Sequence, residues 1–242
     1  MRICIITDNK FAYESITELV KQKDFELYDF DFFCSDQSPQ WITESNLNVM
    51  EIKLKEQNEI FFNQYDLFLS IHAKQIFPAN LVNKHRCINI HPGFNPYNRG
   101  WYPHAFSIMN SKPAGVTIHE MDSQLDHGKI IYQERVEMKS WDTSGSLYGR
   151  ILKKEKEMLD KYLKDIIEGN YSSEETIVPG NLNTKKNYQE LCCIDLKKTA
   201  TYGEVINLLR ATTFPPYDNA YFYDENGEKI YINVQLKKGG CE

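Results

Sequence analysis

The sequence predicts an α/β fold with a mostly parallel, twisted sheet, helices on both faces, and a small C-terminal helix and β-hairpin. Short apolar runs alternate with segments of helical periodicity through most of the first 170 residues, as in chains whose strands are joined by helices. A polar stretch containing Pro179-Gly180 then interrupts the periodicity. Near the C-terminus, Asn226-Gly227 lies between two aromatic and β-branched runs, which is the strongest short signal for a hairpin.

The first 91 residues predict four strands and a helix. Residues 1–8 form a short apolar run that is typical of a buried strand, and residues 11–23 have apolar positions at helical spacing. Residues 25–35 alternate aromatic and acidic side chains, as a half-buried strand does. The apolar runs 65–73 and 86–91 predict two further buried strands.

The next segments predict two helices and two more strands. Residues 101–110 carry a proline near their start, which is typical of a helix N-terminus. Strands are expected at 114–122 and 129–138, joined by a short polar loop. A long charged helix is expected from about 143 to 168, with an apolar stripe along one face.

A domain boundary is predicted near residue 178. It divides the chain into a domain of residues 1–178 and a small C-terminal region of residues 179–242. That region contains a predicted helix at 201–213 and the hairpin at 220–236. Because a two-stranded hairpin is only marginally stable alone, we expect it to pack on the main domain or on a second copy of the chain.

Composition narrows the classes of function. The net charge of -6 argues against a nucleic-acid partner, and no apolar run approaches the roughly 20 residues that a membrane-spanning helix needs. Six cysteines without a C-x-x-C pair indicate reduced thiols and a cytoplasmic location. The first strand-to-helix turn has no glycine and the chain has no G-x-x-x-x-G-K motif, which argues against a dinucleotide site and a phosphate loop.

Asn89 and His91 are the strongest candidates for catalytic residues. They lie two positions apart on the predicted strand 86–91, so their side chains point to the same face. Pro92 ends that strand, and open parallel sheets form their ligand crevices at the carboxyl ends of strands. An imidazole can move a proton near neutral pH and a carboxamide N–H can stabilise an oxyanion, so the pair suits attack on a carbonyl.

Asp126 follows 35 residues after His91, next to the flexible Gly128, and could supply the carboxylate that orients the histidine. Two other interpretations stay open from the residues alone. Asn-x-His at a strand end also occurs as turn chemistry. A metal site could be built from His119, Asp122, Asp126 and His127, although their spacing matches no zinc pattern.

The loop after His91 is rich in potential ligand-binding side chains. Within seven positions it carries Asn95, Tyr97, Asn98, Arg99 and Trp101. An arginine offers a fork of donors to a phosphate, and aromatic rings offer stacking surfaces. The same composition also fits an exposed loop whose aromatics cover the core, so the residues alone leave both uses open.

Taken together, "NIHPGFNPYNRGW" and "AGVTIHEMDSQLDHGKII" resemble the formyltransferase family that uses 10-formyltetrahydrofolate. That family has N-x-H at a strand end and L-D-x-G about 35 residues later, and the resemblance spans roughly residues 1–170. The family's tRNA and ribonucleotide enzymes commonly continue with H-x-S-L-L-P. Here "HPGFNPYNRGWYPH" and the later "LRATTFPPYDNAYF" instead resemble the sugar-nucleotide N-formyltransferases.

The resemblance implies a Rossmann-like formyltransferase fold and a specific reaction. The formyl group of the cosubstrate 10-formyltetrahydrofolate would pass to the amine of a dTDP-linked 3- or 4-amino-dideoxyhexose. The product would serve lipopolysaccharide biosynthesis, as a sugar of a surface polysaccharide of the O-antigen type. Asn89 and His91 would hold the oxyanion, and Asp126 would orient the imidazole and help to take the amine proton. We expect a cytoplasmic homodimer that needs no metal, nucleic acid or membrane.

The same resemblance assigns binding residues. The folate is expected against Ile76, Phe77, Pro78, Leu81 and Asp122. The sugar nucleotide is expected against Asn95, Tyr97, Asn98, Arg99 and Trp101, with Arg210, Phe214 and Tyr217 near the base or the diphosphate. Two alternatives are another folate-dependent formyltransferase acting on a ribonucleotide amine, and a nucleotide-sugar binding module without catalysis.

Overall fold

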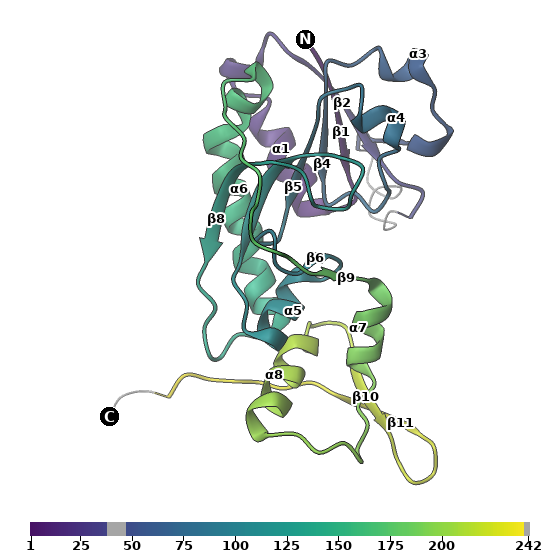
Figure 1. Ribbon diagram of the computed structural model, residues 1–242, viewed down its shortest axis with the longest axis vertical. Coiled ribbons are helices and arrows are strands. Elements are labelled where there is room, and N and C mark those ends of the chain that lie inside the picture. Colours follow the sequence, from purple (N-terminus) through teal and green to yellow (C-terminus); the bar gives the residue numbers. More distant parts are fainter. Residues whose placement is uncertain (38–46, 240–242) are drawn as a thin grey trace. The chain divides into compact units, whose positions relative to one another are not determined.

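The computed structural model describes residues 1–37 and 47–239, and the chain forms two compact units (Figure 1). Unit 1 consists of residues 1–92, 116–134 and 152–178, and unit 2 consists of residues 93–115, 135–151 and 179–242. The last segment of unit 1 therefore ends at Val178. The division of the chain into residues 1–178 and 179–242 stays a prediction.

A seven-stranded sheet forms the framework of unit 1, with its strands in the order β3-β2-β1-β4-β5-β7-β8. The pairs among β1 to β5 are parallel, and β5 pairs with β7 in the antiparallel sense. This confirms the predicted α/β fold with a mostly parallel sheet. The strands are β1 (Arg2–Thr7), β2 (Asp29–Cys34), β3 (Met50–Glu51), β4 (Leu67–Ile71), β5 (Cys87–His91), β7 (Ala114–Glu120) and β8 (Ile130–Val136).

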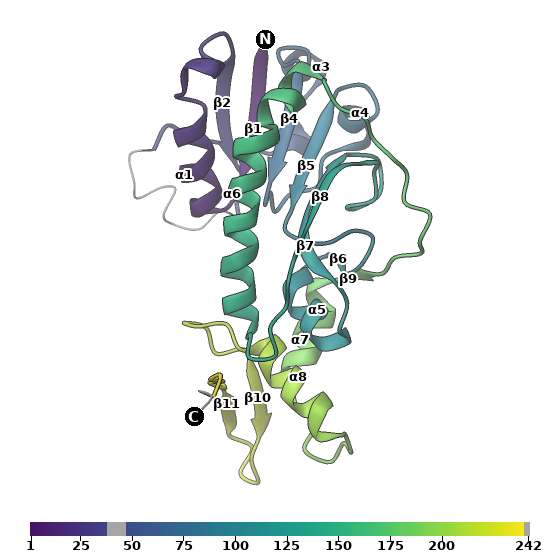
Figure 2. The same ribbon diagram turned by 90° about the vertical axis from the view of Figure 1, so that its left-hand side faces the viewer.

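Helices cover both faces of this sheet in unit 1 (Figures 1 and 2). On one face α1 (Lys10–Leu19) lies beside the unit 1 part of α6 (Ser144–Glu168), where Lys156 pairs with Glu18 at 3.2 Å. On the other face lie α3 (Glu59–Phe62) and α4 (Ala79–Val82), whose apolar side chains join a buried cluster with strand residues. These two short helices have no periodic pattern and were not predicted from the sequence.

Helix α1 shows how local sequence sets an element of unit 1. The side chain of Asn9 accepts a hydrogen bond from the backbone N–H of Ala12, which satisfies a free donor at the helix start. Ala12, Ile16 and Leu19 are buried at helical spacing, so one face of the helix packs on the sheet. Two 3-10 turns, η1 (Lys23–Phe25) and η2 (Leu54–Glu56), complete the connections of this unit.

Unit 2 is mostly helical, with two small strand pairs. Its elements are β6 (Arg99–Gly100), α5 (Pro103–Asn110), β9 (Leu182–Asn183), α7 (Lys185–Cys192), α8 (Tyr202–Thr212), β10 (Ala220–Tyr223) and β11 (Lys229–Ile232). α8 and the β10-β11 hairpin agree with the predicted helix and hairpin, and Gly227 in the hairpin turn has a φ of +79°. Helix α7 follows directly on an irregular polar stretch and was not predicted from the sequence. Within the described residues, no helix has the length and apolar composition needed to cross a membrane.

Candidate active site

Strand β5 supplies two of the polar side chains in unit 1. Ile88 and Ile90 are fully buried, while Asn89 and His91 alternate with them and are also largely buried. Alternation along a strand puts the two polar side chains on one face. The sheet therefore preassembles the amide and the imidazole, as the N-x-H motif predicted.

The antiparallel neighbour β7 adds a second histidine. In the register of the two strands Asn89 lies opposite His119, and His91 lies opposite Thr117. Directly opposed residues in an antiparallel pair share a face of the sheet, with their Cβ atoms about 5 Å apart. Four polar side chains from two strands thus form one patch in unit 1.

Asp126 comes from the loop that joins β7 to β8, and its backbone is left-handed with a φ of +49°. Asparagine and aspartate are among the few non-glycine residues that adopt this conformation readily. At Gly128 a Cβ atom would lie 1.9 Å from the backbone oxygen of Glu120, so only glycine fits there. The left-handed backbone at Asp126 and the close approach at Gly128 together shape the loop of the L-D-x-G motif.

The three predicted catalytic residues converge in unit 1. Asn89 Nδ2 donates a hydrogen bond to Asp126 Oδ1 at 2.9 Å. The other carboxylate oxygen, Asp126 Oδ2, lies 3.5 Å from His91 Nδ1. A single buried carboxylate therefore faces both the amide and the imidazole.

This arrangement has the parts needed for acyl transfer. A carboxylate close to Nδ1 fixes the ring so that Nε2 faces away from it, and it stabilises positive charge on the imidazole. The amide supplies N–H donors to a developing oxyanion. Catalytic hydrogen bonds are often longer in a ligand-free protein than in the reacting complex, so a separation of 3.5 Å agrees with this use.

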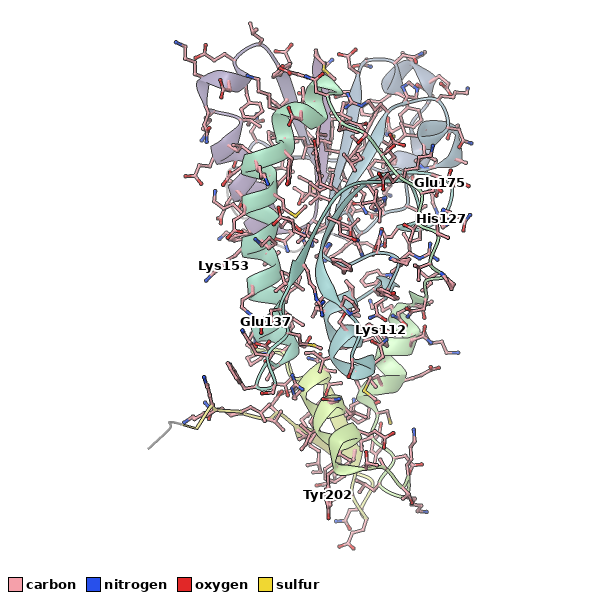
Figure 3. The ribbon with its side chains drawn as sticks, turned by 60° about the vertical axis from the view of Figure 1, so that its left-hand side comes forward. Lys112, His127, Glu137, Lys153, Glu175 and Tyr202 are labelled. Atoms are coloured by element: carbon pink, nitrogen blue, oxygen red, sulfur yellow. The ribbon has the colours of Figure 1, made fainter. Side chains whose placement is uncertain are left out.

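The metal-site interpretation finds no support in the part of the chain that the structure describes, where no group of three potential metal ligands occurs. Asp122 and His127 instead pair with each other through Oδ2 and Nδ1 at 2.7 Å, and both side chains are partly exposed. Figure 3 labels His127 at the protein surface. Asp122 Oδ1 also accepts the backbone N–H of Gln124, so this side chain braces the loop that carries Asp126.

The predicted folate residues all lie in unit 1. Phe77 and Leu81 are buried in the core cluster, and Pro78 precedes α4. Ile76 is 63% exposed, which leaves an apolar side chain open to a ligand beside a rigid core. Their contact with folate stays a prediction.

The loop residues predicted for the sugar nucleotide lie in unit 2, and Asn98 has a clear structural role there. It is fully buried, and its amide pairs with the amide of Asn110 on α5. It also accepts hydrogen bonds from Asn181 and Asn183, on the segment that contains β9. Asn98 thus ties its own loop to two other parts of unit 2.

The other members of this loop differ in accessibility. Asn95 is buried, and the Nε atom of Arg99 is buried without a hydrogen-bond partner in the described residues. Tyr97 lies under the ammonium of Lys112 at 5.3 Å, and Trp101 lies under that of Lys185 at 5.6 Å. Their role in substrate binding stays a prediction.

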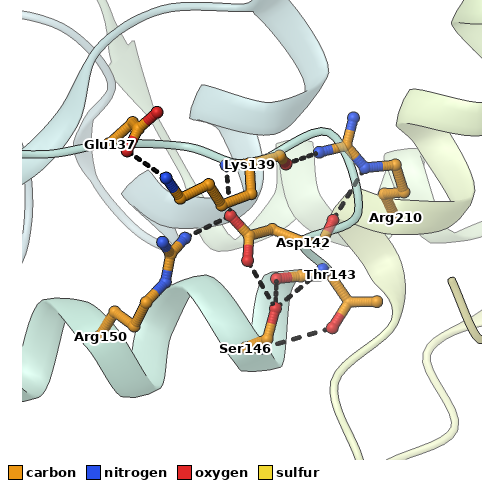
Figure 4. A network of polar contacts seen from close by, with 7 residues as sticks. All are labelled: Glu137, Lys139, Asp142, Thr143, Ser146, Arg150 and Arg210. Carbon is orange, nitrogen blue, oxygen red and sulfur yellow. Dashed lines mark hydrogen bonds and ion pairs between the residues drawn. The ribbon is translucent and has the colours of Figure 1, made fainter. Parts of the chain in front are cut away.

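Arg210 is buried in unit 2, where its guanidinium holds a turn (Figure 4). It donates to the backbone oxygens of Lys139 at 2.7 Å and Asp142 at 2.8 Å, and to the side chain of Asn207. Burial lowers the pKa of this guanidinium from its ordinary value. Of the neighbouring aromatic residues, Phe214 packs against His104 and Tyr148, while Tyr217 is 63% exposed.

Unit 2 also contains a pocket of about 520 Å³ that was not predicted from the sequence. Its walls include the cationic side chains of Lys139 and Arg150, the partly exposed ring of Trp141, and residues 234–236. The signal in the sequence was a tryptophan within a polar turn. The sequence suggests for His119 only a role as a metal ligand, and its position opposite Asn89 follows from the β5-β7 register.

Comparison with known proteins gives consistent matches along the chain. A family model described as "Formyl transferase" matches residues 43–163, and one described as "N-formyltransferase dimerization C-terminal domain" matches residues 187–238. A dTDP-4-amino-4,6-dideoxyglucose formyltransferase from Mycobacterium bovis is 41% identical over 238 residues, covering 98% of this chain and 97% of the relative.

Two solved structures extend the likeness to the fold. A 4-N formyltransferase from Francisella tularensis has a TM-score of 0.92 at 41% identity, covering 98% of each chain. A sugar N-formyltransferase from Shewanella has a TM-score of 0.95 at 36% identity, covering 99% of each chain. These matches confirm the resemblance seen in the sequence motifs, and the chain belongs to the formyltransferase family.

Proposed function

We propose that this protein transfers the formyl group of 10-formyltetrahydrofolate to the 4-amine of a dTDP-linked 4-amino-4,6-dideoxyhexose. The approach of Asn89 and His91 to the Asp126 carboxylate is the observation that carries the chemistry. The substrate is proposed from the named relative that is 41% identical over 97% of its own length. The reaction would take place in the cytoplasm and supply a sugar for a surface polysaccharide, without nucleic acid or membrane.

In the proposed mechanism the neutral sugar amine attacks the formyl carbon, which forms the new C–N bond and an oxyanion. Asn89 donates an N–H to that oxyanion, and His91 donates from the ring nitrogen that faces away from Asp126. Asp126 balances the charge on the imidazole and helps to take the amine proton. The bond from the formyl carbon to N10 then breaks, and the proton lost by the amine replaces the formyl group on N10.

A kinetic comparison tests this proposal. Asn89→Ala should lose roughly 100-fold or more in turnover, because an oxyanion donor lowers the activation barrier by about 3 kcal/mol. His91→Ala should lose turnover to a similar extent, because proton transfer contributes roughly 100- to 10,000-fold. Asn63→Ala is a matched control, since Asn63 is an exposed amide in unit 1. Folate and dTDP affinities should stay within a few fold in all three variants.

The decisive measurement is single-turnover transfer to a panel of dTDP-amino sugars, followed by mass spectrometry. A near-normal single-turnover rate in His91→Ala would refute the assigned role. Failure to formylate any 3- or 4-amino sugar, with transfer to a ribonucleotide amine instead, would favour the other folate-dependent activity. Absence of any formylated product would favour a binding module.

We also propose that the protein forms a homodimer through the β10-β11 hairpin. The family model for a dimerization domain covers this segment, and Tyr223, Ile230 and Tyr231 expose between 38% and 54% of their surface. Exposed aromatic and apolar side chains on a marginal hairpin indicate a surface that is covered by a partner. Light scattering should give the mass of two chains for the wild-type protein and of one chain for Tyr231→Glu. A monomeric wild-type protein at micromolar concentration would refute the dimer.

A further inference from the structure

His119 is a buried histidine of β7 whose protonation pattern follows from its partners. Its Nδ1 atom lies 2.7 Å from the backbone oxygen of Glu120. A carbonyl oxygen only accepts hydrogen bonds, so Nδ1 carries the proton. On a neutral ring this leaves the lone pair on Nε2, which becomes a hydrogen-bond acceptor.

That acceptor faces the amide of Asn89, with 3.3 Å between His119 Nε2 and Asn89 Nδ2. Asp126 Oδ1 lies farther from the same Nε2 atom, at 3.8 Å. The same Nδ2 atom donates to Asp126 Oδ1 at 2.9 Å. The two N–H bonds of the amide are therefore directed at two acceptors. Turning the amide over would put its oxygen against a carboxylate and a lone pair, which is electrostatically unfavourable, so the two acceptors fix which end of the amide faces Asp126.

The fold makes this contact persistent. Asn89 and His119 are directly opposed in the β5-β7 register, and the two side chains are 9% and 1% exposed. Water therefore has little access to replace the ring as an acceptor. In contrast, Asp126 lies on a loop, where it also faces His91.

We propose that His119 is a positioning residue, which rests on the proposed function. His119 accepts the N–H of Asn89 that points toward β7. This keeps the other N–H of the amide directed toward Asp126 and His91. That second N–H is the one that a substrate oxygen recruits. In this role His119 acts through the amide of Asn89 and makes no direct contact with the reacting groups.

Three substitutions separate this role from simple packing. His119→Gln places an oxygen near the former Nε2 position but loses the bond to Glu120. His119→Asn keeps a donor near Nδ1 for the Glu120 oxygen but cannot reach Asn89. His119→Phe keeps a flat ring and loses both contacts.

We expect kcat to depend on whether residue 119 offers a hydrogen-bond acceptor to the amide of Asn89. The Gln variant should retain kcat within about threefold, while the Asn and Phe variants should each lose about tenfold or more, the effect of one hydrogen bond that orients the amide. KM for both substrates should change by less than about twofold, because the contact serves the transition state. If His119 only stabilised the fold, kcat would follow the melting temperature. The His119→Asn variant, which keeps the bond to Glu120, would then have a kcat equal to or above that of His119→Gln. That order would overturn the inference.

A second measurement does not depend on catalysis. Long-range ¹H–¹⁵N NMR spectra of protein labelled at histidine should show His119 in the neutral Nδ1–H form, identified by the loss of its signals in His119→Phe. A neutral Nε2–H form, or an imidazolium whose Nε2–H faces Asp126 Oδ1 at 3.8 Å, would overturn the inference even in an active enzyme. Absence of turnover in the wild-type protein would refute the proposed function, while the NMR spectrum would still show whether Nε2 of His119 is free to accept a hydrogen bond.

Discussion

Replacing Arg210 separates two roles for this side chain. The family resemblance implies that it binds the substrate, and the structure shows it holding a turn of unit 2. Arg210→Met removes the two hydrogen bonds to the backbone oxygens of Lys139 and Asp142 and the bond to Asn207. The methionine keeps much of the apolar stem, so the change acts mainly on the guanidinium.

The expected loss follows from the bonds themselves. A hydrogen bond from a charged donor contributes about 1.5 to 3 kcal/mol. Burial of the guanidinium, which lowers its pKa, offsets part of this contribution. Counting the two backbone bonds at the lower end gives about 3 kcal/mol for Arg210→Met. Arg210→Lys should lose about half as much, because one ammonium cannot copy the fork of the guanidinium.

The assay is urea unfolding, with Arg135→Met as the control because Arg135 is an exposed arginine of the same unit. The control should change the free energy of unfolding by less than about 0.5 kcal/mol. Titration of dTDP into each folded variant completes the test. A loss below about 1 kcal/mol in Arg210→Met, together with a large loss of dTDP affinity, would refute the structural role.

Three further predictions concern the site and its strand. Gly128→Ala should lower single-turnover transfer about 100-fold with the circular dichroism spectrum unchanged, because the Glu120 carbonyl must move and displace the loop of Asp126. Asp126→Asn should keep the free energy of unfolding within about 1 kcal/mol, because asparagine also tolerates the left-handed backbone, while transfer is lost. Burial raises the pKa of the Cys87 thiol from 9.0 to about 12, so its contribution to stability is complete below pH 9 and declines above it. The free energy of unfolding, measured with urea, should therefore fall between pH 7.5 and pH 10 in both proteins. The fall should be about 1.4 kcal/mol smaller in Cys87→Ala than in the wild type.

Patterns that depend on local sequence could be predicted. The apolar runs of β1, β4 and β5, the long helix α6 and the hairpin turn at Gly227 each carry their signal within a few residues. Short elements such as α3 and β6 carry no such signal, because one helical turn or two residues cannot show a period. Their existence depends on packing with distant parts of the chain.

The residues of unit 2 show the same limit at the level of side chains. Asn98 and Arg210 have the chemistry of ligand-binding residues, and the local sequence around each does not reveal what its side chain contacts. Asn98 bonds to Asn181 and Asn183, which lie more than 80 residues away along the chain. Arg210 bonds to backbone oxygens about 70 residues away. Side chains whose partners are distant cannot be told from ligand-binding residues by type alone.

The position of Asp126 shows why the antiparallel strand matters to the chemistry. β7 runs opposite to β5 and ends at Glu120, beside Ile88, so the loop that follows begins near the amino end of β5. The backbone bond from Glu120 to the oxygen of Lys129 closes this loop at the same level. The carboxylate must therefore come back along the face of the sheet to reach Asn89 and His91. The left-handed Asp126 and the close approach at Gly128 shape that return, and the antiparallel register that sets the start of the loop also places His119 opposite Asn89. In unit 1 the carboxylate, the amide and the ring that orients the amide are thus set by one strand pairing.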